Sequence, residues 1–267
     1  MADAIKLFFA FARVSMLTQM EYRLGYVVRM AGKVIDFGGS FAILAIMLFR
    51  FQSIGTWSAH EVLFLYSLNI LTYSVAATFT MPICNIGASI RSGTMDAALT
   101  RPVNPLYLII CQNASAGYIT NYLLGLGVMV FALVNLQIEI TFASVALLVL
   151  SIMGGILIHA AALIACGVPS FWTVKNNALP RIFYWEFNRF VDYPINIYSG
   201  FIQGILTFVL PYAFISFYPA GLFLGRTDDT IFHPVIFYLS PLVGIVCFAL
   251  AYRFWKFGLD AYQSTGS

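Results

Sequence analysis

Residues 90–105 read IRSGTMDAALTRPVNP, a short polar segment between two long apolar runs, 61–83 and 106–136. With 61% hydrophobic and only 9% charged residues, the chain has few polar residues to place. A polar insert between two runs of bilayer length therefore marks a place where the protein meets water and a partner in it. The two prolines near its end block helix propagation, which predicts a separate short helix over about 90–100.

The composition on both sides of this insert is typical of a multispanning membrane protein. Mean hydropathy is +0.87, whereas a soluble domain carries roughly a quarter of charged residues. Backbone groups in lipid must bond within helices or closed barrels, and continuous rather than alternating apolar runs favour helices. A span needs about 20 apolar residues. Six segments qualify within a single transmembrane domain over 1–267: 31–50, 61–83, 106–136, 141–168, 195–218 and 234–255.

Lysine and arginine are distributed unevenly over the loops between these segments. With six spans both termini lie on one side, which receives all 14 lysines and arginines except Arg50 and Arg226. Because positive residues accumulate in the cytoplasm, we expect both termini and the insert to be cytoplasmic, together with a second polar segment, 169–194. The net charge of +3 forms no dense patch, which argues against a nucleic-acid partner.

Three further segments carry structural signals. Residues 1–25 contain an amphipathic stretch that can lie at the lipid headgroups. Lys33 and Asp36 share a helix face, where they form a neutralising pair or, alternatively, couple transport to an ion. Residues 211–226 are apolar but broken by Pro211 and Pro219, which predicts an external re-entrant element.

Polar side chains within the later spans either bond across helices or line a substrate path. They are Asn69, Asn113, Asn121, Asn135, His159 and Gln203. His159 has no carboxylate or second histidine nearby in sequence, so a metal or proton-relay role is the weaker interpretation. Gly200 and Gly204 have the spacing that lets helices approach closely.

The sequence contains no recognisable catalytic constellation. The four cysteines form no C-x-x-C pair and are interpreted as small packing residues rather than disulfides or metal ligands. No phosphate-binding loop, G-x-S-x-G or H-E-x-x-H motif occurs. We therefore expect no catalytic residue, cofactor or metal site in this chain.

Three stretches together resemble a known family. GTMDAALTRPVNPL, from Gly93, is similar to the G-x-(I/L/F)-D-x-x-L-x-(R/K)-P segment of type-2 ATP-binding-cassette (ABC) exporter permeases, in particular a bacterial branch. LPYAFISFYPAGLFLG, 210–225, agrees with that branch, and FWKFGLDAYQSTGS, 254–267, resembles its W-x-x-G-L-x-x-Y-x-S-x-G tail. One departure is Asp260 with Ala261, where the family has an arginine before the tail tyrosine.

The resemblance implies an all-α integral membrane protein with six transmembrane helices, an N-terminal elbow helix over 1–25, a cytoplasmic coupling helix and external re-entrant helices. Gly93, Asp96, Leu99, Arg101 and Pro102 fall on the coupling segment. Such a subunit lies in membrane lipid of the bacterial plasma membrane. It pairs with a second permease copy or homologue and with separate ABC ATPase subunits, which bind ATP and Mg.

The function implied is export of a substrate from the cytoplasm, without ATP hydrolysis by this chain. Two alternatives remain open. An ion-coupled secondary transporter usually has internal repeats and several intramembrane charges, for which Lys33 and Asp36 are the only candidates here. A membrane-embedded lipid-modifying enzyme would need clustered His, Asp or Glu at one membrane face, which the sequence lacks.

Overall fold

The computed structural model describes residues 53–113, 116–136, 138, 141–173 and 180–263, with single positions between 25 and 50. The predicted elbow segment, 1–25, lies outside these described residues except for Gly25. Most of the first span and the pair Lys33 and Asp36 also lie outside them. Their expected structures stay predictions.

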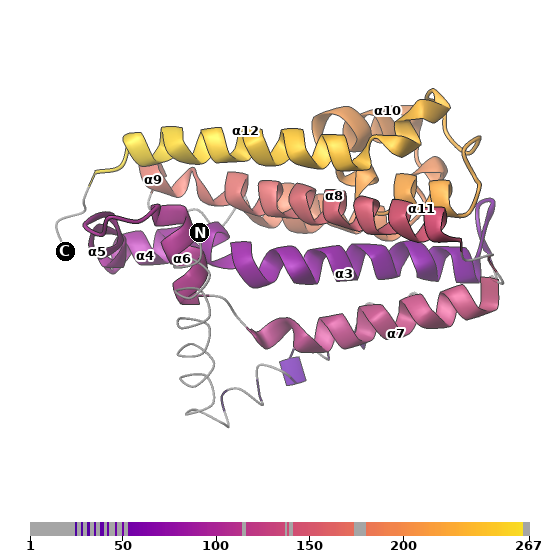
Figure 1. Ribbon diagram of the computed structural model, residues 1–267, viewed down its shortest axis with the longest axis horizontal. Coiled ribbons are helices and arrows are strands. Elements are labelled where there is room, and N and C mark those ends of the chain that lie inside the picture. The colour runs from indigo at the N-terminus through magenta and orange to yellow at the C-terminus, as the bar shows by residue number, and fades with distance from the viewer. Residues whose placement is uncertain are drawn as a thin grey trace.

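Long helices run along one axis of the molecule (Figure 1). Four helical stretches of the described chain are long and apolar enough to cross a membrane, and a bent fifth one, 200–223, counts if it is one span. The long helices are α3 (Ala59–Cys84), α7 (Ile119–Leu136), α8 (Phe142–Gly167) and α12 (Ser240–Asp260). The prediction of an all-α membrane protein is confirmed by these helices, whereas six spans stay a prediction.

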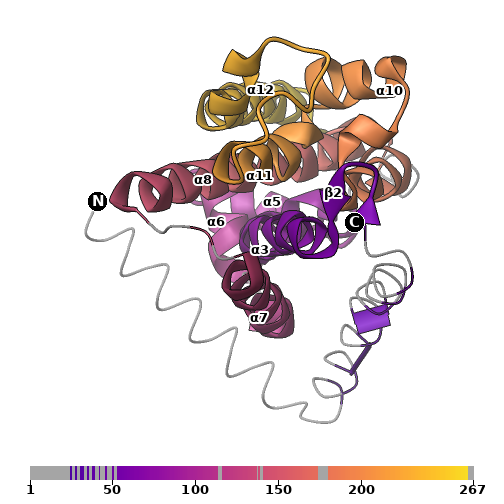
Figure 2. The same ribbon diagram turned by 90° about the vertical axis from the view of Figure 1, so that its right-hand side faces the viewer.

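The long helices pack in the order α7, α3, α8, α12, which the view along the bundle displays (Figure 2). Helices α8 and α12 cross where Gly154 meets Gly244. A Cβ added to either glycine would lie 2.5 Å from a backbone oxygen of the other helix, on Ser240 and Gly154 respectively. The predicted packing glycine Gly204 has no atom within 4 Å of its Cβ position among the described residues. The close crossing within the protomer is therefore made by a different glycine pair.

Shorter elements gather at the two ends of the bundle (Figure 1). One end holds the polar insert and the end of α12, together with α4 (Ile86–Arg91), α5 (Thr94–Leu99), α6 (Pro105–Asn113) and α9 (Ser170–Thr173). We call it the insert end. The opposite end holds the antiparallel hairpin of β1 (Ser53–Ile54) and β2 (Trp57–Ser58) and, beside it, α11 (Phe217–Phe223). We call it the hairpin end.

Two predicted spans begin with short or broken helices. The third, 106–136, starts with α6, is followed at residues 116–118 by η1 (Ala116–Tyr118) and continues as α7. The sixth, 234–255, opens with the 3-10 helix η7 (Pro234–Tyr238) before α12. The second and fourth spans agree with α3 and α8 to within two residues at each end.

Residues 180–199 pack against α8 and α3 from the middle of the bundle to the hairpin end, with one face buried, and the cytoplasmic location predicted for 169–194 stays a prediction. They form irregular helices η2 (Pro180–Glu186), η3 (Arg189–Asp192) and η4 (Ile195–Ile197). Tyr184 bonds His159 of α8, Asp192 bonds Asn69 of α3, and Asn196 reaches Thr56 in the hairpin. These three side chains thus bond to the bundle and its hairpin, whereas Glu186 and Arg189 are exposed and pair with each other.

A bent helical pair follows over 200–223, which overlaps the span predicted over 195–218 and bends near Pro211. It comprises α10 (Gly200–Gly204), η5 (Ile205–Val209), η6 (Tyr212–Phe214) and α11, with a bend of 78°. Pro211 lies in this bend, where it ends the first helix. Phe223, at its far end, packs on Phe64 near the start of α3. This pair, 200–223, begins before the re-entrant element predicted over 211–226.

Candidate functional site

The predicted coupling segment lies at the insert end as two short helices, α4 and α5, instead of one helix over 90–100. The turn between them uses Gly93, whose φ of +68° is in the left-handed region. A side chain with a Cβ is strained there, so glycine suits this position. The turn sets α5 off from α3 and allows α5 to pack on the end of the bundle.

One face of α5 is anchored in the protein. Met95 is 1% exposed and belongs to an apolar cluster that joins α5 to α3, α6, α8, α9 and α12. We call it the base cluster; it comprises Ile83, Ile86, Ile90, Met95, Leu106, Ile109, Ala161, Ile164, Val168, Phe171, Ala251 and Trp255. The base cluster therefore ties α5 to the neighbouring parts of the long helices through a stiff, packed core.

The other face of the segment is open. Leu99 is 37% exposed, and Arg101 and Pro102 are exposed beside it. An apolar side chain next to an arginine and a rigid proline forms a surface suited to a protein partner. These three predicted residues thus lie together on one accessible surface, which we call the open face of the insert.

Asp96 differs from the other predicted coupling residues because its carboxylate is held within the protein. The Tyr262 hydroxyl donates to Asp96 Oδ1 over 2.8 Å. Burial and the Asp96 carboxylate raise the pKa of Tyr262 to about 12, so the tyrosine is a neutral donor at physiological pH. Asp96 therefore fastens the C-terminal tail to α5.

The tail motif noted in the sequence has a structural explanation in these contacts. Trp255 is 1% exposed and packs edge-on against Phe171 of α9, with ring centroids 5.2 Å apart. Gly258 leaves room for the same phenylalanine, since an added Cβ would lie 2.7 Å from its Cδ2 atom. With Tyr262, these residues hold the end of α12 on the insert.

A buried polar cluster lies midway along the bundle; it comprises Asn69, His159, Tyr184 and Asp192. Asn69 Nδ2 donates to Asp192 Oδ1 over 2.7 Å, and Asn69 Oδ1 lies 3.2 Å from His159 Nε2. Because that amide oxygen can only accept, Nε2 carries the proton, and Nδ1 accepts from the Tyr184 hydroxyl over 2.8 Å. Sequence reasoning selected Asn69 and His159 but missed the other two.

The remaining predicted polar residues do not join this cluster. Asn113 and Asn135 donate to carbonyls of their own helices, at Ile109 and Phe131. Gln203 donates to the Tyr198 carbonyl, while its amide oxygen is buried without a hydrogen-bond partner among the described residues. Asn121 of α7 is 0% exposed, and neither end of its amide has a partner in that part of the chain.

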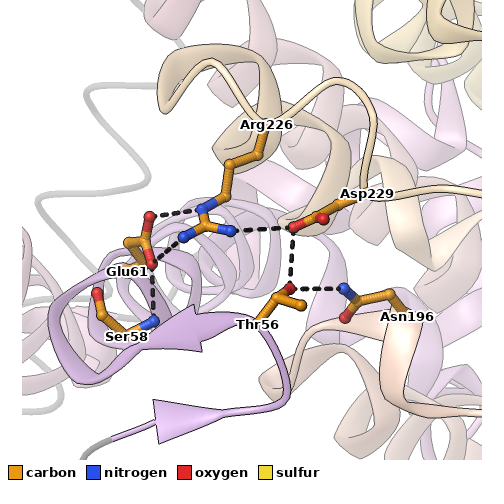
Figure 3. Close-up of polar contacts among 6 residues, drawn as sticks. All are labelled: Thr56, Ser58, Glu61, Asn196, Arg226 and Asp229. Atoms are coloured by element: carbon orange, nitrogen blue, oxygen red, sulfur yellow. Dashed lines mark hydrogen bonds and ion pairs between the residues drawn. The ribbon is translucent and has the colours of Figure 1, made fainter.

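The hairpin end carries an ionic network that sequence reasoning missed, which we call the outer clasp (Figure 3). Glu61 accepts two hydrogen bonds from Arg226, over 2.6 and 3.0 Å, and Asp229 accepts a third over 3.2 Å. Thr56 donates to Asp229 and accepts from Asn196. The clasp thus joins the hairpin, the start of α3, the 180–199 segment and the loop after α11.

Glu61 has a second role at the start of α3. Its carboxylate accepts from the backbone N–H of Ser58 over 2.7 Å, which completes a capping box. The Ser58-x-x-Glu61 spacing was the available sequence signal for this helix start. Hydrogen bonding to Glu61 raises the pKa of Arg226 above its ordinary value, so the guanidinium stays charged.

No group of three or more His, Cys, Asp or Glu side chains within the described ranges is arranged to hold a metal ion. The four cysteines are free thiols. The sequence model of a family described as "ABC-2 family transporter protein" matches residues 34–266. No curated protein matches the chain.

Proposed function

The chain belongs to the ABC-2 family of transporter proteins, and we propose that it is the membrane permease subunit of an ATP-driven exporter. Its matched region, 34–266, covers the insert, the outer clasp and the buried polar cluster. The proposal assigns ATP and Mg to separate ABC ATPase subunits, because the chain carries no phosphate-binding loop of its own. A second permease copy or a homologue completes the transporter.

The single observation that carries this proposal is the construction of α5. Its buried face, with Met95, belongs to the base cluster, while Leu99, Arg101 and Pro102 are accessible to a partner. An ATPase that moves on nucleotide binding would press on the open face of the insert. The base cluster would carry that push into the long helices as a rigid-body rotation.

The proposed orientation puts the insert end in the cytoplasm and the hairpin end outside the plasma membrane. The distribution of lysine and arginine supports it. In this orientation the 200–223 pair enters from the external face and returns to it, and the outer clasp closes that face. An impermeant thiol reagent tests the orientation in intact cells.

For this test, Ala97→Cys and Asp228→Cys are each made in a chain without its native cysteines. Both parent residues are exposed. Cysteine at position 228 should react, whereas cysteine at position 97 should react only after lysis. Reaction at 97 in intact cells would show that the insert end faces outward.

The docking surface is tested with the double variant Leu99→Asp/Arg101→Glu, purified with the candidate ABC ATPase. An exposed ion pair contributes at most about 1 kcal/mol, and loss of an apolar contact adds to it, so binding should weaken by tenfold or more. ATPase stimulation by the permease should fall in parallel. Asp228→Arg, a charge reversal at the opposite end, is the matched control and should change neither quantity.

The double variant must keep its size-exclusion profile and thermal stability for the comparison to count. Because both side chains are exposed, the fold should tolerate the change. Unchanged association together with unchanged ATPase stimulation would mean that the insert is not the docking surface. Transport would then require another explanation.

A further inference from the structure

A hollow of about 440 Å³ lies between α8 and α12, on the insert-end side of their glycine crossing. It exists because six of its lining side chains are small: Ala161, Ala162, Ala165, Cys166, Cys247 and Ala251. Leu210 to Tyr212, at the bend of the 200–223 pair, and Phe183 of η2 complete its wall. A volume of this size is within the range of ligand pockets.

The lining offers no free hydrogen-bonding group to a ligand. Apart from two cysteine thiols, which behave as small apolar groups, its only side-chain polar group is the Tyr212 hydroxyl. That hydroxyl already donates to the Phe183 carbonyl over 2.8 Å. A polar ligand would lose its hydration here without compensation, so the hollow suits a hydrocarbon chain.

The hollow opens sideways from the bundle, toward the surface that lipid would cover. Leu250, Phe254 and Phe183 line it and are also 59%, 37% and 46% exposed. Phe254 lies six residues before the end of α12, which is about 9 Å along a helix. The opening is therefore close to the insert end of α12, where the lipid chains meet the headgroups if α12 spans the membrane.

The end of α12 next to this opening carries groups that bind lipid headgroups. Arg253 is exposed there, whereas the Lys256 ammonium lies 4.9 Å from the centre of the Tyr252 ring, away from the hollow. Trp172 of α9 packs against Phe254 and Phe257, and tryptophan is enriched at the headgroup level. Because Arg253 follows the lining residue Leu250 by three positions, a phosphate above an inserted chain would meet its positive charge, which favours an anionic lipid.

We propose that this hollow binds one acyl chain of an anionic bilayer phospholipid, whose phosphate lies near Arg253. Ala161 and Ala251 belong both to the hollow and to the base cluster, so the bound chain lies against the part of the protein that α5 contacts. The site requires only that the chain is embedded in a membrane; it does not depend on export or on an ATPase.

The test uses the full chain in nanodiscs that contain phosphatidylglycerol with a diazirine near the end of one acyl chain. After irradiation, mass spectrometry should locate the adducts in peptides with residues 158–166 and 247–254. Labelling should saturate as the mole fraction of probe rises, and excess unlabelled phosphatidylglycerol should reduce it. Phosphatidylcholine with the same photoreactive chain should label these peptides several-fold less.

Two variants and one control separate a built site from an ordinary lipid-facing surface. Ala162→Phe fills the hollow and should reduce labelling of both peptides at least fivefold. Ala249→Phe adds the same volume to an exposed position on α12 that does not line the hollow, and should leave labelling unchanged. Arg253→Gln should abolish the preference for phosphatidylglycerol over phosphatidylcholine.

Several results would overturn the proposal. Labelling that rises linearly with probe, equals that of the exposed face of α7 and is insensitive to Ala162→Phe would indicate bulk lipid only. Absence of labelling in the wild type, with cross-linking between cysteines placed at position 250 of two copies, would mean that a second permease covers the opening. Saturation and competition in the wild type decide the matter even if Ala162→Phe fails to fold.

Discussion

The outer clasp makes a quantitative prediction about stability. Glu61 and Arg226 are 165 residues apart in sequence and form a bidentate ion pair whose side chains are 12% and 30% exposed. Arg226→Gln leaves the Glu61 carboxylate largely buried without its main partner. Breaking a buried pair costs about 3–5 kcal/mol and an exposed one under about 1 kcal/mol. This partly buried pair should cost about 2 kcal/mol.

The reciprocal change separates the ion pair from the helix cap. Glu61→Gln keeps a side-chain oxygen for the Ser58 N–H, since glutamine also serves in a capping box, but removes the negative charge. If the pair is the main interaction, the double variant Glu61→Gln/Arg226→Gln should lose less stability than the two single changes together. The difference should be roughly 1–2 kcal/mol.

Thermal unfolding in detergent measures this cycle. A loss of 1 kcal/mol lowers Tm by roughly 2–4 °C in a protein of about this size, so Arg226→Gln should unfold about 4–8 °C below the wild type. Asp228→Asn, at an exposed carboxylate in the same loop, is the control and should be neutral. Additivity of the two single changes to within about 0.5 kcal/mol would refute the clasp as a coupled unit.

Two further changes test other contacts. Tyr262→Phe should lower the free energy of unfolding by about 1 kcal/mol and speed hydrogen exchange in α5, because Asp96 loses its donor. Since the pKa of Tyr262 in the folded protein is raised to about 12, the stability difference between wild type and variant should be full below pH 10 and shrink between pH 10 and 12. A stability difference that does not depend on pH would contradict this reasoning. Asn121→Leu should raise Tm by about 2–4 °C, because it removes a buried amide that has no partner among the described residues; a lower Tm would indicate that the amide is bound.

Local sequence patterns predicted the parts of the fold that depend on local physics. The apolar runs behind α3 and α8 were continuous, so their ends could be predicted to within two residues. The insert was recognised because polar residues are rare here, and the open face with Leu99, Arg101 and Pro102 agrees with its predicted accessibility.

The buried partners could not be predicted, because they join residues far apart in the chain. Asp192 is 123 residues from Asn69, and Tyr262 is 166 residues from Asp96. No local periodicity records such pairs. The packing of residues 180–199 against α3 and α8 could not be predicted either, because the charged Glu186 and Arg189 stand beside the buried Tyr184, which resembles an interfacial aromatic in sequence.

The glycine crossing of α8 and α12 has a mechanical consequence. These helices touch at Gly154, midway along α8, and Gly244, near the start of α12, and again through Phe171 and Trp255. They therefore resist scissoring, and we expect α3, which packs on α8, to tilt with them. A lever of the length of α3, about 39 Å by helix rise, turns a tilt of about 5° at its foot into a displacement of roughly 3 Å at its tip. That displacement is about as long as the hydrogen bonds between Glu61 and Arg226, which lie at this end of α3.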